Sequence, residues 1–77
     1  MTYTTNAMWN TTETLANAED AVMNARKSAR LTHAAYDRMV AGLCKADRLM
    51  AEARNNQCGE RLAAVATISG RLIAAAM

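Results

Sequence analysis

The fold is decided by residues 15–53, LANAEDAVMNARKSARLTHAAYDRMVAGLCKADRLMAEA, in which small and apolar side chains recur every seven residues. One row of this pattern contains Leu15, Val22, Ala29, Tyr36, Leu43 and Met50, and the row three positions later contains Ala18, Ala25, Thr32, Met39, Ala46 and Ala53. Such heptads are typical of a long helix that packs lengthwise against another helix. The second row is mostly alanine, which allows close backbone approach but buries little area, so the pattern indicates a helix that needs a partner.

The residues before the heptads lack their periodicity. Residues 1–9, MTYTTNAMW, are rich in Thr and Asn, so we expect a flexible N-terminal arm followed by a single helical domain over residues 10–77. Asn10 and Glu13 have the spacing of a capping box, in which each side chain satisfies a backbone amide of the first helical turn. The first helix should therefore begin near residue 11.

Residues 11–54 contain no Pro, and Gly42 is their only Gly, which predicts one helix over about 11–54. The stretch NNQCG at 55–59 predicts a turn, with an asparagine in the left-handed conformation. A second helix is predicted over about 60–76. Its apolar face would contain Leu62, Val65, Ile68 or Ser69, Leu72 and Ile73.

Folding the chain at this turn predicts an all-α helical hairpin in which Gly42 approaches Gly70 and the second helix reaches back to about residue 38. The remaining apolar stripe then needs a cover. In the preferred arrangement two chains pair into a homodimeric bundle, because residues 28–33 contain no Gly, Pro or Asn to break the helix. The alternative is a break near 28–33 that gives a three-helix bundle. The dimer seam would contain Leu15, Ala18, Val22, Ala25, Ala29, Thr32 and Tyr36.

Composition favours a small intracellular chain. Of its 77 residues 52% are hydrophobic, but 18 are alanine, so the core is thin and docking or oligomerisation is expected to support it. The net charge of +2 is only mildly basic. No signal peptide or membrane-spanning run is evident, and two cysteines are too few for a disulfide scaffold. We therefore expect a cytoplasmic protein with reduced thiols and no membrane contact.

The residues that carry reaction chemistry are sparse. His33 and Asp37 share a helical face, but a solvated pair explains them better than a metal or acid–base site. Cys44 is expected to be a small buried side chain and Cys58 an exposed free thiol. No phosphate loop or nucleophile–base set is present. We expect no enzyme activity, no cofactor and no metal.

Two groups are candidates for contact with another protein. Trp9, Met8 and Tyr3 on the expected arm offer aromatic and apolar surface, unless Trp9 packs back on the helix or across the dimer seam. Arg26, Lys27 and Arg30 form a basic turn that either is a solvated face or recognises an acidic protein surface.

The sequence is most consistent with a non-enzymatic protein-binding module, an adaptor or an inhibitor that occludes a partner protein. Phages and mobile elements encode many such accessory proteins, some of which block a host enzyme or defence complex in the host cytoplasm. One alternative is a nucleic-acid-associated regulator that uses the basic helix face. Another is a structural subunit of a larger helical assembly.

Overall fold

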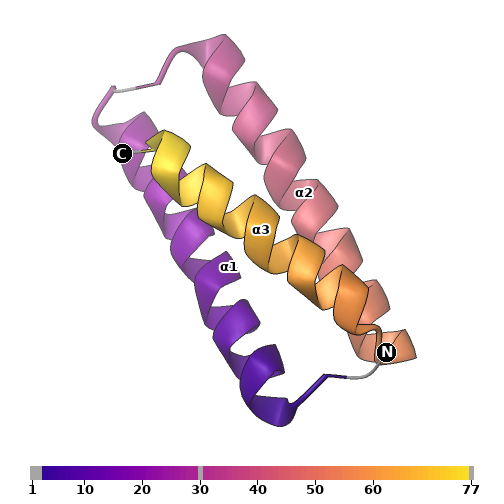
Figure 1. The fold of residues 1–77 in the computed structure, drawn as a ribbon. Coiled ribbons are helices and arrows are strands. Elements are labelled where there is room, and N and C mark those ends of the chain that lie inside the picture. The colour runs from indigo at the N-terminus through magenta and orange to yellow at the C-terminus, as the bar shows by residue number, and fades with distance from the viewer. Residues whose placement is uncertain (1–2, 30, 77) are drawn as a thin grey trace.

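The computed structural model describes residues 3–29 and 31–76, and in these ranges the chain forms three α-helices (Figure 1). They are α1 (Thr5–Lys27), α2 (His33–Asn56) and α3 (Gly59–Ala76). The predicted all-α class is confirmed. The arrangement is the three-helix bundle that the sequence left as the alternative to the hairpin.

The C-terminal helix α3 is the centre of the bundle. It runs between α1 and α2 and packs extensively against both, whereas α1 and α2 contact each other much less (Figure 1). The reason lies in α3 itself, whose buried side chains Leu62, Val65 and Leu72 give it the most apolar sequence of the three helices. One apolar helix thus covers the stripes of two amphipathic ones.

The predicted continuous helix over 11–54 is wrong, because the chain leaves the helix after Lys27 and starts again at His33. The Ser28 N–H donates to the Asn24 carbonyl, and Ala29 takes the left-handed conformation with φ of 57°. Thr32 then caps α2 by accepting a hydrogen bond from the Ala35 N–H at 3.1 Å. The break is favoured because it lets α3 bury the stripe of α1 within one chain.

The predicted N-terminal arm is also wrong for residues 5–9, which belong to α1. Thr4 is the N-cap and accepts from the Ala7 N–H at 3.0 Å, so the capping box expected at Asn10 and Glu13 lies inside the helix. Tyr3 is held as well, since its hydroxyl donates to the Ala53 carbonyl of α2 at 3.0 Å. Of the expected arm, residues 1 and 2 lie outside the described ranges.

The second connection lies close to its predicted place. α2 ends at Asn56, and Gln57 rather than an asparagine takes the left-handed conformation, with φ of 49°. Its N–H donates to the Ala53 carbonyl, which closes the last turn of α2. The observed α3 agrees with the helix predicted over about 60–76.

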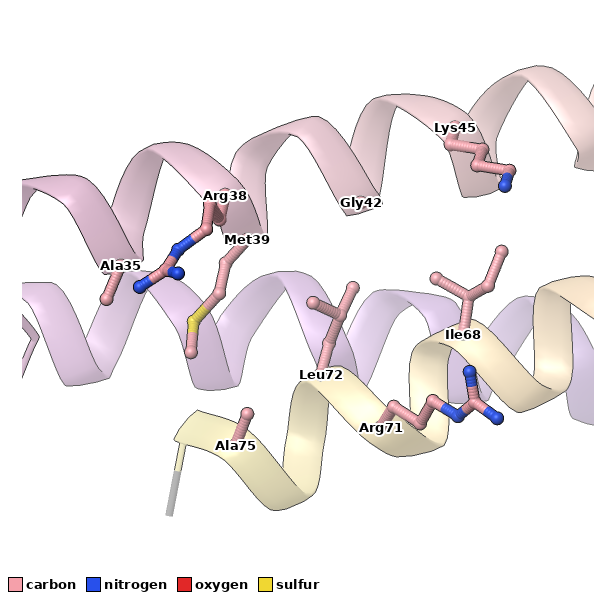
Figure 2. A pocket seen from close by; sticks show the side chains of 9 residues that line it. All are labelled: Ala35, Arg38, Met39, Gly42, Lys45, Ile68, Arg71, Leu72 and Ala75. Atoms are coloured by element: carbon pink, nitrogen blue, oxygen red, sulfur yellow. The ribbon is translucent and has the colours of Figure 1, made fainter.

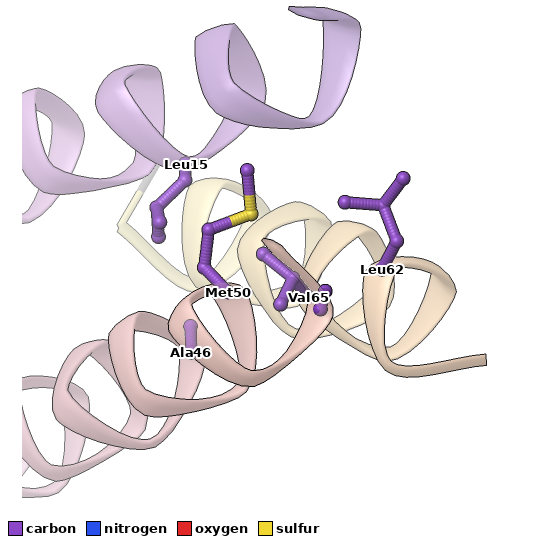
Figure 3. Packing of buried hydrophobic residues seen from close by; sticks show 6 residues of the cluster. Leu15, Ala46, Met50, Leu62 and Val65 are labelled. Atoms are coloured by element: carbon purple, nitrogen blue, oxygen red, sulfur yellow. The ribbon is translucent and has the colours of Figure 1, made fainter. Parts of the chain in front are cut away.

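Figure 3 shows how the three helices meet in the core, where Leu15 of α1, Met50 of α2 and Val65 of α3 point toward one another. Four of the predicted seam residues, Leu15, Ala18, Val22 and Ala25, are buried inside this single chain. Of the other three, Ala29 and Thr32 are exposed in the α1–α2 connection and Tyr36 is half-buried on α2. The apolar stripe of α1 that suggested a dimer seam is therefore covered by α3 of the same chain. A homodimer stays a prediction, but it is no longer needed to cover this stripe.

The predicted approach of Gly42 to Gly70 is wrong. Gly42 faces the side chain of Leu72, and Gly70 is exposed with open space where a side chain would stand. Because Gly42 has no side chain, the outer surface between α2 and α3 is hollowed at this point.

Candidate protein-binding groove

A groove of about 440 Å³ runs along the outer junction of α2 and α3 (Figure 2). Both walls are helices, which pack side by side here. α2 contributes Ala35, Arg38, Met39, Gly42 and Lys45, and α3 contributes Ile68, Arg71, Leu72 and Ala75. The groove is open to solvent on its outer side.

The floor of the groove is apolar. Met39 of α2 and Ile68 and Leu72 of α3 extend into the space between the two helices (Figure 2). Leu72 is buried, whereas Met39 and Ile68 remain half-buried and offer apolar surface to a ligand. Gly42 keeps the middle of the floor low, since a longer residue would fill the space against Leu72.

The rim of the groove is cationic. Arg38 and Lys45 stand on the α2 side and Arg71 on the α3 side, and all three are exposed (Figure 2). None of them has an acidic residue three or four positions away, where a helical partner would lie. Within residues 3–29 and 31–76 the ion pairs join His33 to Asp37 at 3.4 Å and Arg61 to Glu52 at 2.8 Å, and neither includes a rim cation.

The structure separates the two groups of partner-binding residues that the sequence suggested. Tyr3 and Met8 pack against the core at the start of α1, and only Trp9 of that group is well exposed, with 65% of its surface accessible. Arg26 and Lys27 lie in the last turn of the same helix, about 25 Å away along its axis. The exposed Trp9 and the basic turn therefore do not form one surface.

The basic turn has a structural role in the bundle. Arg26 stacks over the Tyr36 ring of α2, with 4.2 Å from the guanidinium carbon to the ring centroid. Arg26 and Lys27 also place positive charge at the C-terminus of α1, where the helix dipole favours it. Lys27 is exposed, and Arg30 lies outside the described residues.

The residues considered for reaction chemistry do not converge. His33 and Asp37 form an exposed pair, and in the described part of the chain no three His, Cys, Asp or Glu side chains gather as metal ligands would. Cys44 and Cys58 are free thiols. Cys44 is exposed, so its predicted burial is wrong. Cys58 lies just before α3 and is half-buried, so the prediction that it is exposed is wrong as well.

The sequence pattern does not predict the groove, although it contains one of the groove's signals. Arg38 and Lys45 are seven residues apart on one face of α2, each without an acidic helical neighbour. What the sequence did not show is that Arg71 completes the rim from α3, because that depends on how the two helices pack.

Comparison of the chain with protein-family models, with curated proteins and with solved structures finds no match. Among the helices of the described ranges, none is both long enough and apolar enough to cross a membrane.

Proposed function

We propose that this protein is a non-enzymatic protein-binding module that takes an acidic amphipathic helix of a partner protein into the α2–α3 groove. The observation that carries this proposal is the pairing of an apolar floor with three rim cations that have no local counter-charge. A ligand that buries apolar side chains between Met39, Ile68 and Leu72 brings its flanking groups next to these cations. Acidic flanks are therefore favoured and basic ones repelled.

The shape of the groove supports a helix as the ligand. Its walls are two packed helices, and a third helix laid along such a junction adds to a bundle by ordinary ridge-and-groove packing. Helix-in-groove recognition uses apolar anchors at the spacing of successive helical turns. The open outer side leaves room for the charged face of such a helix.

A single-stranded nucleic acid is less well matched to this surface. Its bases usually stack on aromatic side chains, and the groove is lined by aliphatic residues, Met and Gly between the cations. A groove of this kind suits an adaptor. It also suits an inhibitor that binds a helix of its partner and so prevents that helix from making another interaction.

The test is a titration of a fluorescent acidic amphipathic peptide, with Leu at turn spacing and Glu on both flanks, into the folded chain. Binding is expected in the micromolar range, about −8 kcal/mol, and should weaken with salt. Replacing Arg38 and Lys45 together by Glu should abolish it. Arg48→Glu is the control, because Arg48 is exposed on α2 outside the groove.

A peptide with Lys in place of Glu should not bind. A peptide affinity that is unchanged by the Arg38 and Lys45 reversal would refute the groove as the binding site. Tighter binding of a single-stranded oligonucleotide than of the acidic peptide, lost with the same reversal, would replace the protein partner by a nucleic acid. Circular dichroism of each variant verifies that the helices are retained.

A further inference from the structure

The outer face of α1 carries an apolar row that the core does not use. Trp9 and Met23 are the exposed large hydrophobic residues of the described chain, with accessible fractions of 65% and 52%. They lie fourteen residues apart with exposed Ala16 midway, so the three fall on one side of the helix at heptad spacing. The opposite side of α1 packs against α3.

Acidic side chains flank this row. Glu13 and Asp20 are exposed, seven residues apart, and each lies within one turn of the apolar row on the α1 surface. The outer face of α1, defined by Trp9, Glu13, Ala16, Asp20 and Met23, therefore has the chemistry that the α2–α3 groove favours: apolar anchors with acidic neighbours.

The charges of the two surfaces also agree in spacing. Glu13 and Asp20 are separated by about 10 Å along the axis of α1. Arg38 and Lys45 have the same seven-residue separation along α2. A docked α1 can therefore place one carboxylate beside each cation, whether it runs parallel or antiparallel to α2. Arg71 on the other wall adds positive charge to the same rim.

We infer that a second copy of this chain occupies the groove, with the outer face of α1 of one molecule docked between α2 and α3 of the next. This inference rests on the groove chemistry proposed above. A chain cannot dock its own α1 in this way while that helix packs on its own α3. The contact is therefore intermolecular and joins two different surfaces.

Such a contact leaves one groove and one α1 face free on every complex. Unless rotation closes a ring, association continues into open chains instead of stopping at a dimer. The α1 face and the groove each contain far fewer residues than one side of a stable protein–protein interface, so self-association is weak. An acidic helix from a partner protein competes for the same groove and dissociates the chains.

The experiment compares two variants by sedimentation velocity, from about 10 μM to about 1 mM protein, the range of weak association. The face variant carries Trp9→Ala and Met23→Ala, and the groove variant carries Arg38→Glu and Lys45→Glu. All four positions are exposed, so the substitutions leave the core residues unchanged. Asn17→Ala and Arg48→Glu are the matched controls on exposed positions of α1 and α2.

The wild-type mass should rise with concentration and fall in high salt, and each control should behave like the wild type. Each variant alone should stay monomeric. An equimolar mixture of the two should form a one-to-one dimer and grow no further, since it contains one intact face and one intact groove.

A wild-type chain that stays monomeric to about 1 mM overturns the inference. So does a closed dimer that both variants form equally well, because that contact would use other surfaces. The face variant keeps the groove, so its binding of the acidic peptide tests the proposed function separately. Peptide binding without self-association refutes the second copy as occupant, and self-association without peptide binding refutes the acidic partner helix.

Discussion

The side chain of Leu72 lies directly over Gly42 where α3 packs against α2: a Cβ at Gly42 would stand 3.3 Å from Leu72 Cδ2 and 3.6 Å from Cδ1. The smaller distance is tighter than ordinary van der Waals contact, so this one missing side chain sets how closely the two helices approach. The same closeness brings Arg38 and Lys45 to the rim that Arg71 completes.

Substitution of Gly42 and of Gly70 should therefore have different effects. Gly70→Ala should stabilise the fold by up to about 1 kcal/mol, because the site is open and Ala is the better helix former. Gly42→Ala should gain less, since Leu72 must shift, and Gly42→Leu should destabilise by about 1–3 kcal/mol through overpacking. Chemical denaturation measures the free energy of unfolding of all three variants. Stabilisation by Gly42→Leu would contradict the contact.

The left-handed Ala29 between α1 and α2 offers a second comparison. A residue with a Cβ is strained at φ of 57°, so Ala29→Gly should stabilise the chain by about 1 kcal/mol. Ala16→Gly is the matched control: it makes the same change at an exposed right-handed position of α1 and should cost a similar amount. Thermal melts of both variants check the opposite signs. Loss of stability in both would contradict a break at Ala29.

The contrast between α3 and the α1–α2 connection shows what the sequence could predict. Leu62, Val65 and Leu72 repeat at helical spacing and end at a turn-forming stretch, so local pattern alone located α3 and its buried face. The break after Lys27 has no such local signal, because an alanine takes the left-handed conformation there. Burial of two helices by a third outweighs the strain of one residue, and that gain is not visible in a local window.

The same distinction applies to the candidate site. Trp9 is exposed and its role as a contact residue stays a prediction, whereas Tyr3 and Met8 pack against the core once α1 starts at Thr5. The charges of Arg38 and Lys45 were readable as an uncompensated pair. The sequence does not show that Arg71 lies on the same rim, because residues 38 and 71 come together only through the packing of α2 against α3.

The buried hydroxyl of Ser69 provides a test of the core of α3. Ser69 is fully buried, and its Oγ has no hydrogen-bond partner among the described residues. An unsatisfied buried hydroxyl costs about 1–3 kcal/mol, so Ser69→Ala should stabilise the protein by about 1 kcal/mol. Thr67→Ala, at an exposed site of the same helix whose hydroxyl bonds the Ala63 carbonyl, is the control and should have little effect. A lower unfolding midpoint for Ser69→Ala would contradict this account.

Glu19 should make stability depend on pH. Partial burial, followed by the negative charges of Asp47 and Asp20, raises the pKa of its carboxyl above the ordinary value of 4.5. The folded state thus holds this proton more tightly, and the stabilisation is complete below pH 4.5 and lost as pH rises through the raised pKa. Glu19→Gln should raise the melting temperature at neutral pH, with a difference that vanishes below pH 4.5. A difference that is constant with pH would contradict the charge effect.

The thiol of Cys58 should be alkylated at a lower pH than an ordinary thiol requires. A hydrogen bond from the Arg61 N–H to its sulfur, with further help from the Arg61 side chain and the Glu60 N–H, lowers the pKa of the Cys58 thiol from its ordinary 9.0 despite partial desolvation. The thiolate is the reactive form, so iodoacetamide should modify Cys58 at lower pH than a free thiol requires. The rate is followed by mass spectrometry in a Cys44→Ser chain, where Cys58 is the one thiol left.

Arg61→Gln removes the side-chain contribution and should move the midpoint of the pH–rate profile upward. Arg54→Gln, an exposed cation of α2, is the control and should leave the midpoint in place. Because a loosened turn alone would change the rate without shifting the midpoint, an Arg61→Gln profile with the original midpoint would show that Arg61 does not hold the Cys58 thiolate.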